Sequence, residues 1–122
     1  ISQHAAALTQ QHIMLYEDAM RSPVVMKLEA ARLGKCYDAL EARLSTPVEN
    51  RDYLLTSGFS AADVSVGQAI YMARHFAKLG GHPAVAEWYE RITERPEFQK
   101  SLPEAGTGLY AQEFYPAWEA AG

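Results

Sequence analysis

Few side chains in this chain have the types and the spacing that chemistry requires. Cys36 is the only cysteine, and it lies on the apolar stripe of a predicted helix, so we interpret it as a buried small hydrophobic residue and not as a nucleophile. His4 and His12 share one helical face but are eight residues apart, too far for joint metal ligation. Neither a glycine-rich phosphate loop nor a convincing metal-ligand spacing is found. We therefore expect no metal, and these patterns identify no catalytic residue.

The most informative stretch runs from Phe59 to Val64. Ser60 followed by Asp63 has the form of a capping box, in which the hydroxyl accepts from the Asp63 amide and the carboxylate accepts from the Ser60 amide. Phe59 and Val64 then occupy the two positions of a hydrophobic staple. The stretch predicts the start of a helix, and in our interpretation Ser60 and Asp63 are structural capping residues.

The helix that begins at Ser60 is predicted to extend to about Leu79, where Gly80 and Gly81 end it. It is apolar around most of its circumference, which indicates a central, buried helix. Gly67 inside it costs about 1 kcal/mol relative to alanine, and close packing against a neighbouring helix explains why a glycine is used.

The remaining chain predicts further helices and no sustained strand. Ser22 and Pro23 are typical of a helix start, and Arg95 before Pro96 is typical of a helix end. The other predicted helices cover residues 1 to about 20, 23 to about 44, 83–95 and 97 to about 102. The predicted core residues of the second and fourth helices are Val25, Leu28, Leu33, Cys36, Tyr37, Leu40, Leu44, Val85, Trp88, Tyr89 and Ile92. The expected fold class is all-α, a bundle of five to six helices in one domain spanning 1–122. Within the loop from Ser45 to Gly58, Tyr53, Leu54 and Leu55 are expected to anchor the loop to the core of this domain.

Composition excludes several classes of function. The chain has 122 residues, nearly half of them apolar, which suits one domain with a real core. The net charge is −4 and no basic run exists, so nucleic acid is disfavoured as a partner. No apolar stretch approaches the roughly 20 residues of a membrane span, and no signal peptide is visible. A single cysteine fits a reducing, cytoplasmic compartment. Because the chain begins with Ile1, we interpret it as a fragment of a longer protein, although processing would also explain this start.

Taken in series, these segments resemble the C-terminal domain of cytosolic glutathione transferases. The resemblance covers most of the chain and is strongest from Tyr53-Leu54-Leu55, through the stretch 59–64, to the segment 82–99. That last segment contains Trp88, Arg91 and then Arg95-Pro96. The tail from Leu109 to Pro116 is similar to the C-terminal ends of bacterial members. No single segment is specific to this family, but the whole series of segments in this order within one window of the sequence is.

The resemblance implies that two domains have different roles. Enzymes of this family bind glutathione in a thioredoxin-like N-terminal domain, which also carries the residue that activates the thiol; that domain is absent here. The helical domain forms much of the hydrophobic pocket for the electrophilic second substrate and part of a homodimer interface. The chain is therefore expected to be the pocket half of a glutathione S-transferase, with glutathione as co-substrate of the parent and no activity alone.

The resemblance also implies roles for individual residues. Tyr71, two turns after Asp63, and His75, one turn further, are expected to face the second-substrate pocket, against the alternatives of core packing and of a histidine satisfied elsewhere. Tyr16 and Met20 border the same pocket, with core packing as the alternative for Met20. Glu17 is a candidate to contact glutathione held by the partner subunit, against a surface carboxylate.

The aromatic tail leaves two interpretations open. Tyr110, Phe114 and Tyr115 either cover the mouth of the pocket or dock on their own domain. Two other functions also compete with the enzyme: a non-catalytic module for protein–protein interaction, as in translation factors and aminoacyl-tRNA synthetases that carry this helical domain, and a stand-alone small-molecule binding protein. Loss of the N-terminal domain would uncover an apolar face, so we expect the isolated chain to self-associate.

Overall fold

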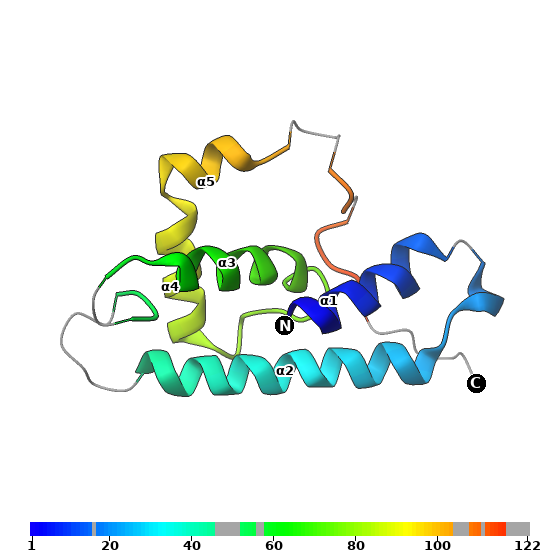
Figure 1. The fold of residues 1–122 in the computed structure, drawn as a ribbon. Helices are drawn as coiled ribbons and strands as arrows, with labels where there is room; N and C mark the ends of the chain where they lie inside the picture. The colour runs from blue at the N-terminus through cyan, green and yellow to red at the C-terminus, as the bar shows by residue number, and fades with distance from the viewer. Residues whose placement is uncertain (16, 46–51, 56–57, 104–107, 111, 117–122) are drawn as a thin grey trace.

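Of the 122 residues, the computed structural model describes 1–15, 17–45, 52–55, 58–103, 108–110 and 112–116. Within these ranges the protein is all-α, as predicted, with an isolated bridge between Leu55 and Gly58 as its β-type pairing (Figure 1). The elements are α1 (Ser2–Thr9), η1 (Gln10–Met14), η2 (Asp18–Met20), α2 (Pro23–Ser45), α3 (Ala61–Ala73), α4 (Pro83–Thr93) and α5 (Pro96–Ser101).

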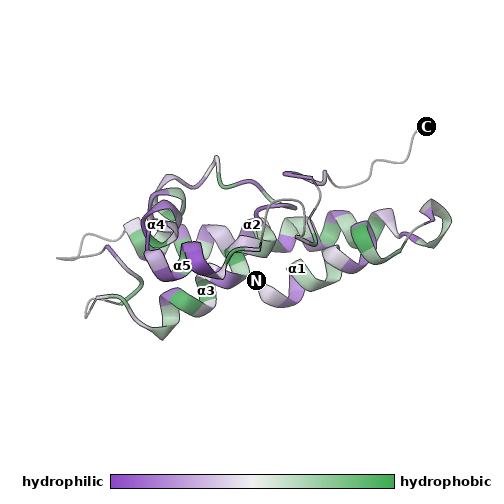
Figure 2. Cartoon of the chain, turned by 90° about the horizontal axis from the view of Figure 1, so that it is seen from above, coloured by the Kyte–Doolittle hydropathy of each residue, from purple (hydrophilic) through white to green (hydrophobic). Residues whose placement is uncertain are grey.

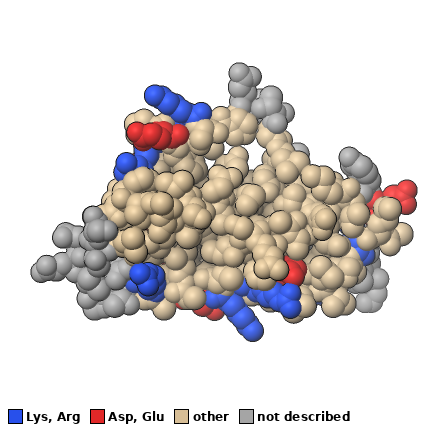
Figure 3. Space-filling model, viewed as in Figure 1, with Lys and Arg blue, Asp and Glu red and all other residues tan. Residues whose placement is uncertain are grey.

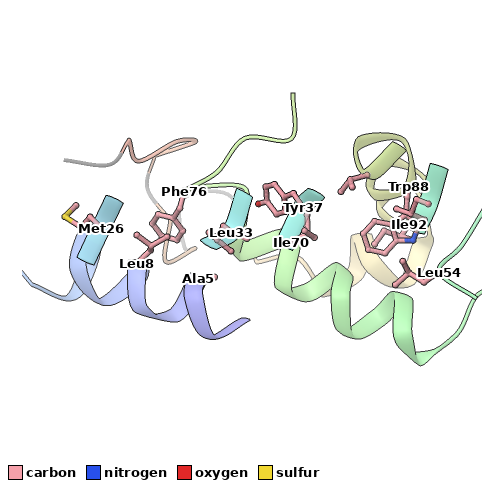
Figure 4. Packing of buried hydrophobic residues seen from close by; sticks show 13 residues of the cluster. Ala5, Leu8, Met26, Leu33, Tyr37, Leu54, Ile70, Phe76, Trp88 and Ile92 are labelled. Carbon is pink, nitrogen blue, oxygen red and sulfur yellow. The ribbon is translucent and has the colours of Figure 1, made fainter. Parts of the chain in front are cut away.

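The long helix α2 forms the base of the molecule, and α3 runs above it (Figure 1). Helices α1 and α4 each pack against both α2 and α3, and α5 packs on α4. The buried apolar side chains form a row between these helices, from Met26 and Leu8 through Leu33, Tyr37 and Ile70 to Trp88 and Ile92 (Figure 4). Leu33, Tyr37, Trp88 and Ile92 in this row were predicted core residues, whereas Met26 was not.

The first predicted helix is wrong in its length. The α-helix ends at Thr9, a π-helical turn follows, and Leu15 is extended, with φ −92° and ψ 114°. The Arg21 guanidinium donates to the carbonyls of His12 (3.2 Å) and Leu15 (2.8 Å) and so satisfies groups that the missing turn would have bonded. The apolar spacing continues past this break, so periodicity alone could not detect it.

The second helix agrees with its predicted bounds, and its start is capped by Ser22, whose hydroxyl oxygen accepts from the Val25 amide at 3.2 Å. Its predicted stripe is wrong at the first turns. Met26 is 1% exposed, whereas Val25 is 37% and Leu28 is 48% exposed. Cys36 is half-buried and not fully buried.

Asp63 lies at the centre of three segments. It is fully buried, and its Oδ1 accepts from the Leu54 amide (3.0 Å) and from the Trp88 indole N–H (2.8 Å). Oδ2 accepts from the Ser60 amide at 2.9 Å, and both halves of the predicted capping box are present. The capping residue of α3 therefore also fixes the Tyr53–Leu54 segment and the middle of α4.

Phe59, one of the two residues of the predicted hydrophobic staple, contacts residues outside α3. The Phe59 ring packs edge-on against Tyr53, with centroids 5.5 Å apart, and the Arg95 guanidinium lies over it at 3.7 Å. Val64, the other staple position, is 59% exposed.

Helix α3 ends at Ala73, earlier than the predicted Leu79. The carbonyls that would continue the helix are used elsewhere. His75 O accepts from the Tyr115 amide at 2.6 Å, and Ala77 O accepts from the Tyr37 hydroxyl at 2.9 Å. The close packing expected at Gly67 is present, because an alanine Cβ there would lie 2.5 Å from Cδ1 of Ile92.

Helix α4 begins at Pro83, as predicted, and buries Val85, Trp88 and Ile92. The amides of its first turn have no partner within the helix and donate instead to a side chain on α2. The Glu41 carboxylate on α2 accepts from the Ala84 amide at 2.9 Å and from the Val85 amide at 2.8 Å. Figure 2 shows pale to green, more hydrophobic residues along α3, whereas α5 is largely hydrophilic. None of the described helices is both long enough and apolar enough to cross a bilayer.

Candidate functional site

A cavity of about 590 Å³ opens between the first half of α3, the end of α4 and α5. Such a volume falls within the range of small-molecule sites. Most of its wall is apolar, and its polar side chains are those of Asp63, Gln68, Arg95, Glu97 and Ser101. The lining residues are Phe59, Asp63, Val64, Gly67, Gln68, Ile92, Arg95, Glu97, Phe98 and Ser101.

Local structure explains how this cavity is held open. The Ile92 side chain extends over Gly67, where no Cβ obstructs it. Phe98 on α5 meets Tyr71 and Tyr89 edge-on, with centroid separations of 6.4 Å and 6.3 Å. These ring contacts fix α5 at a distance from α3, and the space between the two helices is the cavity.

None of the described residues predicted to contact the second substrate lines this cavity. Tyr71 lies behind its wall, where the Arg74 guanidinium sits 5.2 Å from the ring centroid. Met20 is 61% exposed in η2, and Glu17 is exposed in the turn before it. Tyr16 lies outside the described residues.

His75 lies beneath the aromatic tail. It is 6% exposed, its ring stacks on Tyr110 with centroids 4.4 Å apart, and its Nδ1 is 2.9 Å from the carbonyl oxygen of Glu113. A nitrogen facing a carbonyl must carry the proton, so Nδ1–H donates this bond. Burial lowers the pKa of His75, and the bond to Glu113 opposes that shift. The histidine is thus satisfied within the protein.

The described part of the tail docks on its own domain. The Tyr110 hydroxyl is 3.1 Å from the Thr9 hydroxyl, and the Tyr115 ring lies 5.7 Å from the Phe76 ring. Lys78 lies over Phe114, with Nζ 4.6 Å from the ring centroid. Of the two interpretations of the tail, the structure corresponds to docking. It brings His75 and Tyr110 together, whereas Phe114 is held by Lys78.

His12 is a polar group that the sequence analysis considered only as a metal ligand. Its ring stacks on Phe76 at 5.4 Å and lies 5.7 Å from Tyr115, and its Nε2 is buried without a hydrogen-bond partner in the described part of the chain. Burial, and then the charge of Arg21, lower its pKa. Its place in the π-helical turn is a further unusual feature, because such turns recur at functional sites. No local sequence signal marks that turn.

The lowered pKa of His12 predicts a loss of stability in mild acid. The unfolded chain, with the ordinary pKa of 6.5, takes up this proton before the folded protein does. The contribution is therefore complete above pH 6.5 and is lost as the pH falls through the folded pKa. We expect the urea midpoint to fall between pH 7.5 and 5.5, and to fall less in His12→Phe. Equal slopes for the two proteins would contradict the assignment.

The described residues contain no group of three or more His, Cys, Asp or Glu side chains arranged to hold a metal ion. Comparison with known proteins gives one family. The model of the glutathione S-transferase C-terminal domain matches residues 13–91, from the π-helical turn through Asp63 and Trp88 to the end of α4. No curated protein and no solved structure matches the chain. Because the match covers more than half of the 122 residues, the chain belongs to the glutathione S-transferase C-terminal domain family.

Proposed function

We propose that this chain is the helical domain of a cytoplasmic, bacterial-type glutathione S-transferase, in which it forms the hydrophobic wall for the electrophile. The family match carries this proposal. The partly exposed rings of Tyr71 and Tyr110 support it, because flat, polarizable surfaces suit a permissive apolar substrate; His75 lies buried beneath Tyr110 and supports that ring. In Figure 3 charged side chains lie mainly at the edges of the face, and few lie over α1 and α3 between them. Such a face suits a second domain packed against it.

The thiol chemistry belongs to that second domain. Conjugation needs the glutathione thiolate, so the thiol pKa must be lowered by a nearby donor or positive charge. Burial raises the pKa of Tyr37 and of Tyr89. Neither is suited to supply a phenolate or a strong hydrogen-bond donor. Glu17 is the described residue that we propose contacts glutathione, since an exposed carboxylate accepts from peptide amides.

We also propose that the parent is a homodimer. Val24 is 72%, Leu28 48% and Met14 52% exposed, and Val25 beside them is 37% exposed. Val24, Val25 and Leu28 share the first turns of α2, and exposed apolar side chains so close together favour burial against another protein. The second copy is the occupant that the family favours.

The proposal is tested with two proteins, the parent encoded by the complete open reading frame and the 122-residue chain. We expect the parent to be retained on immobilised glutathione and to conjugate a chlorinated nitroaromatic compound. The chain alone should do neither, because we assign the activation of the thiol to the second domain. A parent that lacks a thioredoxin-like domain, or that fails both assays, would favour the interaction module instead.

Variants of the parent separate the proposed roles. Tyr71→Leu should raise the KM for the electrophile by several-fold and leave the KM for glutathione unchanged, whereas Glu17→Gln should do the reverse. Glu94→Gln, at an exposed position of the same domain, is the control and should change neither.

A further inference from the structure

We propose that His12 makes the docking of the tail sensitive to acid, so that a proton on its ring releases residues 112–116 while the helices of the domain stay folded. Two histidines lie beneath the tail, and they contact it in different ways. His75 bonds the backbone of the tail, whereas His12 contacts the Tyr115 ring. The inference concerns the docking of the tail and does not depend on glutathione or on an electrophile.

His75 can hold the tail in either protonation state. Its Nδ1 faces the carbonyl oxygens of Glu113 at 2.9 Å and of Gln112 at 3.1 Å, and its own carbonyl accepts from the Tyr115 amide at 2.6 Å. An imidazole that already donates through Nδ1 keeps this donor when a proton is added to Nε2. Burial lowers the pKa of His75, the bond to Glu113 raises it, and the charge of Arg74 lowers it. Protonation of His75 therefore removes none of these bonds.

His12 differs, because its ring nitrogen has no acceptor for an added proton. The ring stacks on Phe76 with centroids 5.4 Å apart and lies 5.7 Å from the Tyr115 ring. Its Nε2 is buried and has no hydrogen-bond partner in the described part of the chain. In the cationic form both ring nitrogens carry protons, so this buried N–H would stay unpaired. Arg21, whose guanidinium donates to the His12 carbonyl at 3.2 Å, adds a second positive charge nearby.

Release of the tail gives the protonated ring access to water. Tyr115 packs beside His12 and leaves it when residues 112–116 undock, so the solvated ring regains the ordinary pKa of 6.5. In the docked state burial, and then the charge of Arg21, keep the pKa lower. Docking is therefore strongest above pH 6.5 and is lost progressively as the pH falls from there through the lowered pKa of the docked ring. Phe76, which is 2% exposed, is uncovered in the process.

The experiment is hydrogen exchange of the 122-residue chain at pH 7.5 and pH 5.5, followed by mass spectrometry and divided by the exchange rates of an unstructured peptide at each pH. We expect the protection of residues 112–116 to fall by about tenfold, because the Tyr115 amide loses its acceptor on His75. The helix Ala61–Ala73 should keep its protection. Equal losses in the two segments, or no loss in the tail, would overturn the proposal.

Variants identify the histidine that responds. His12→Phe keeps an aromatic ring against Phe76 but cannot take up a proton, so the tail should keep most of its protection at pH 5.5. His12→Gln, which is equally unable to take up this proton, gives a second measurement, and circular dichroism checks the fold of both.

Two other histidines give the comparisons. His4→Gln is the matched control in α1, where the histidine bonds Glu29 and not the tail, and it should respond to pH like the unmodified chain. His75→Leu should lower the protection of the tail by about tenfold at both pH values, because the bonds to the tail backbone are lost. A full response to pH in both His12 variants, or loss of the response in His4→Gln, would contradict the assignment to His12.

Discussion

We expect Asp63→Ala to lower the free energy of unfolding by about 4 kcal/mol. The change leaves the buried donors of Leu54, Ser60 and Trp88 without an acceptor, and each unpaired buried donor costs roughly 1–3 kcal/mol. The loss is a large part of the roughly 5–15 kcal/mol that stabilises an ordinary domain. Urea unfolding followed by circular dichroism measures it.

Two further variants provide the comparisons that are needed to interpret that result. Asp63→Asn should cost nearly as much, because one of its side-chain atoms becomes an NH₂ group that faces donors. Glu94→Gln removes an exposed carboxylate at the C-cap of α4 and should stay within about 0.5 kcal/mol of the unmodified protein. An Asp63→Ala loss of no more than the roughly 1 kcal/mol of a helix cap would mean that Asp63 is only a cap.

Trp88→Ala should cost a similar amount, about 4 kcal/mol, because the side chain is 1% exposed and its removal leaves a large void. Trp88→Phe keeps much of the volume but removes the indole N–H from Asp63, and it should cost about 2 kcal/mol. Chemical denaturation of both variants provides the comparison.

A double-mutant cycle then tests whether the two residues act together. Asp63→Ala should cost less in the Trp88→Phe background than in the unmodified protein, since one of the donors it would orphan is already gone. Strict additivity of the two changes would show that the indole–carboxylate bond contributes little.

The start of the central helix could be predicted from sequence because its signals are local. Ser60 and Asp63 are three residues apart, and a capping box depends on that spacing alone. The other partners of Asp63 could not be predicted in the same way. Trp88 lies 25 residues further along the chain, and only the packing of α4 on α3 brings its indole to the carboxylate.

The two helix ends that were predicted wrongly share one cause. In each case a donor from elsewhere in the chain bonds a carbonyl that a longer helix would have used. Arg21 bonds the carbonyls that end the first helix, and Tyr37 and Tyr115 bond those that end α3. The prediction of which residues α2 buries was wrong at its first turns for a related reason. Val25 and Leu28 have core-type side chains, but at this end of α2 no described helix covers them, and Met26 turns inward instead.

The candidate site was harder to predict than the fold. Tyr71 and His75 are four residues apart, so a helical period predicted their proximity; their ring centroids are 6.3 Å apart, although α3 ends at Ala73. The cavity could not be anticipated, because it depends on how far α5 stands from α3. Phe98 sets that distance through ring contacts with Tyr71 and Tyr89, and no local pattern encodes them.

The cap that Glu41 provides for α4 has a consequence for the order of folding. A helix of this length is marginal by itself, and His82, at its N-cap, makes no capping bond with its side chain. The acceptors for its first amides lie 43 and 44 residues earlier in the chain, on α2. Nucleation of α4 therefore waits for closure of that long loop, which makes α4 a late element of the folding pathway and α2 the template on which it forms.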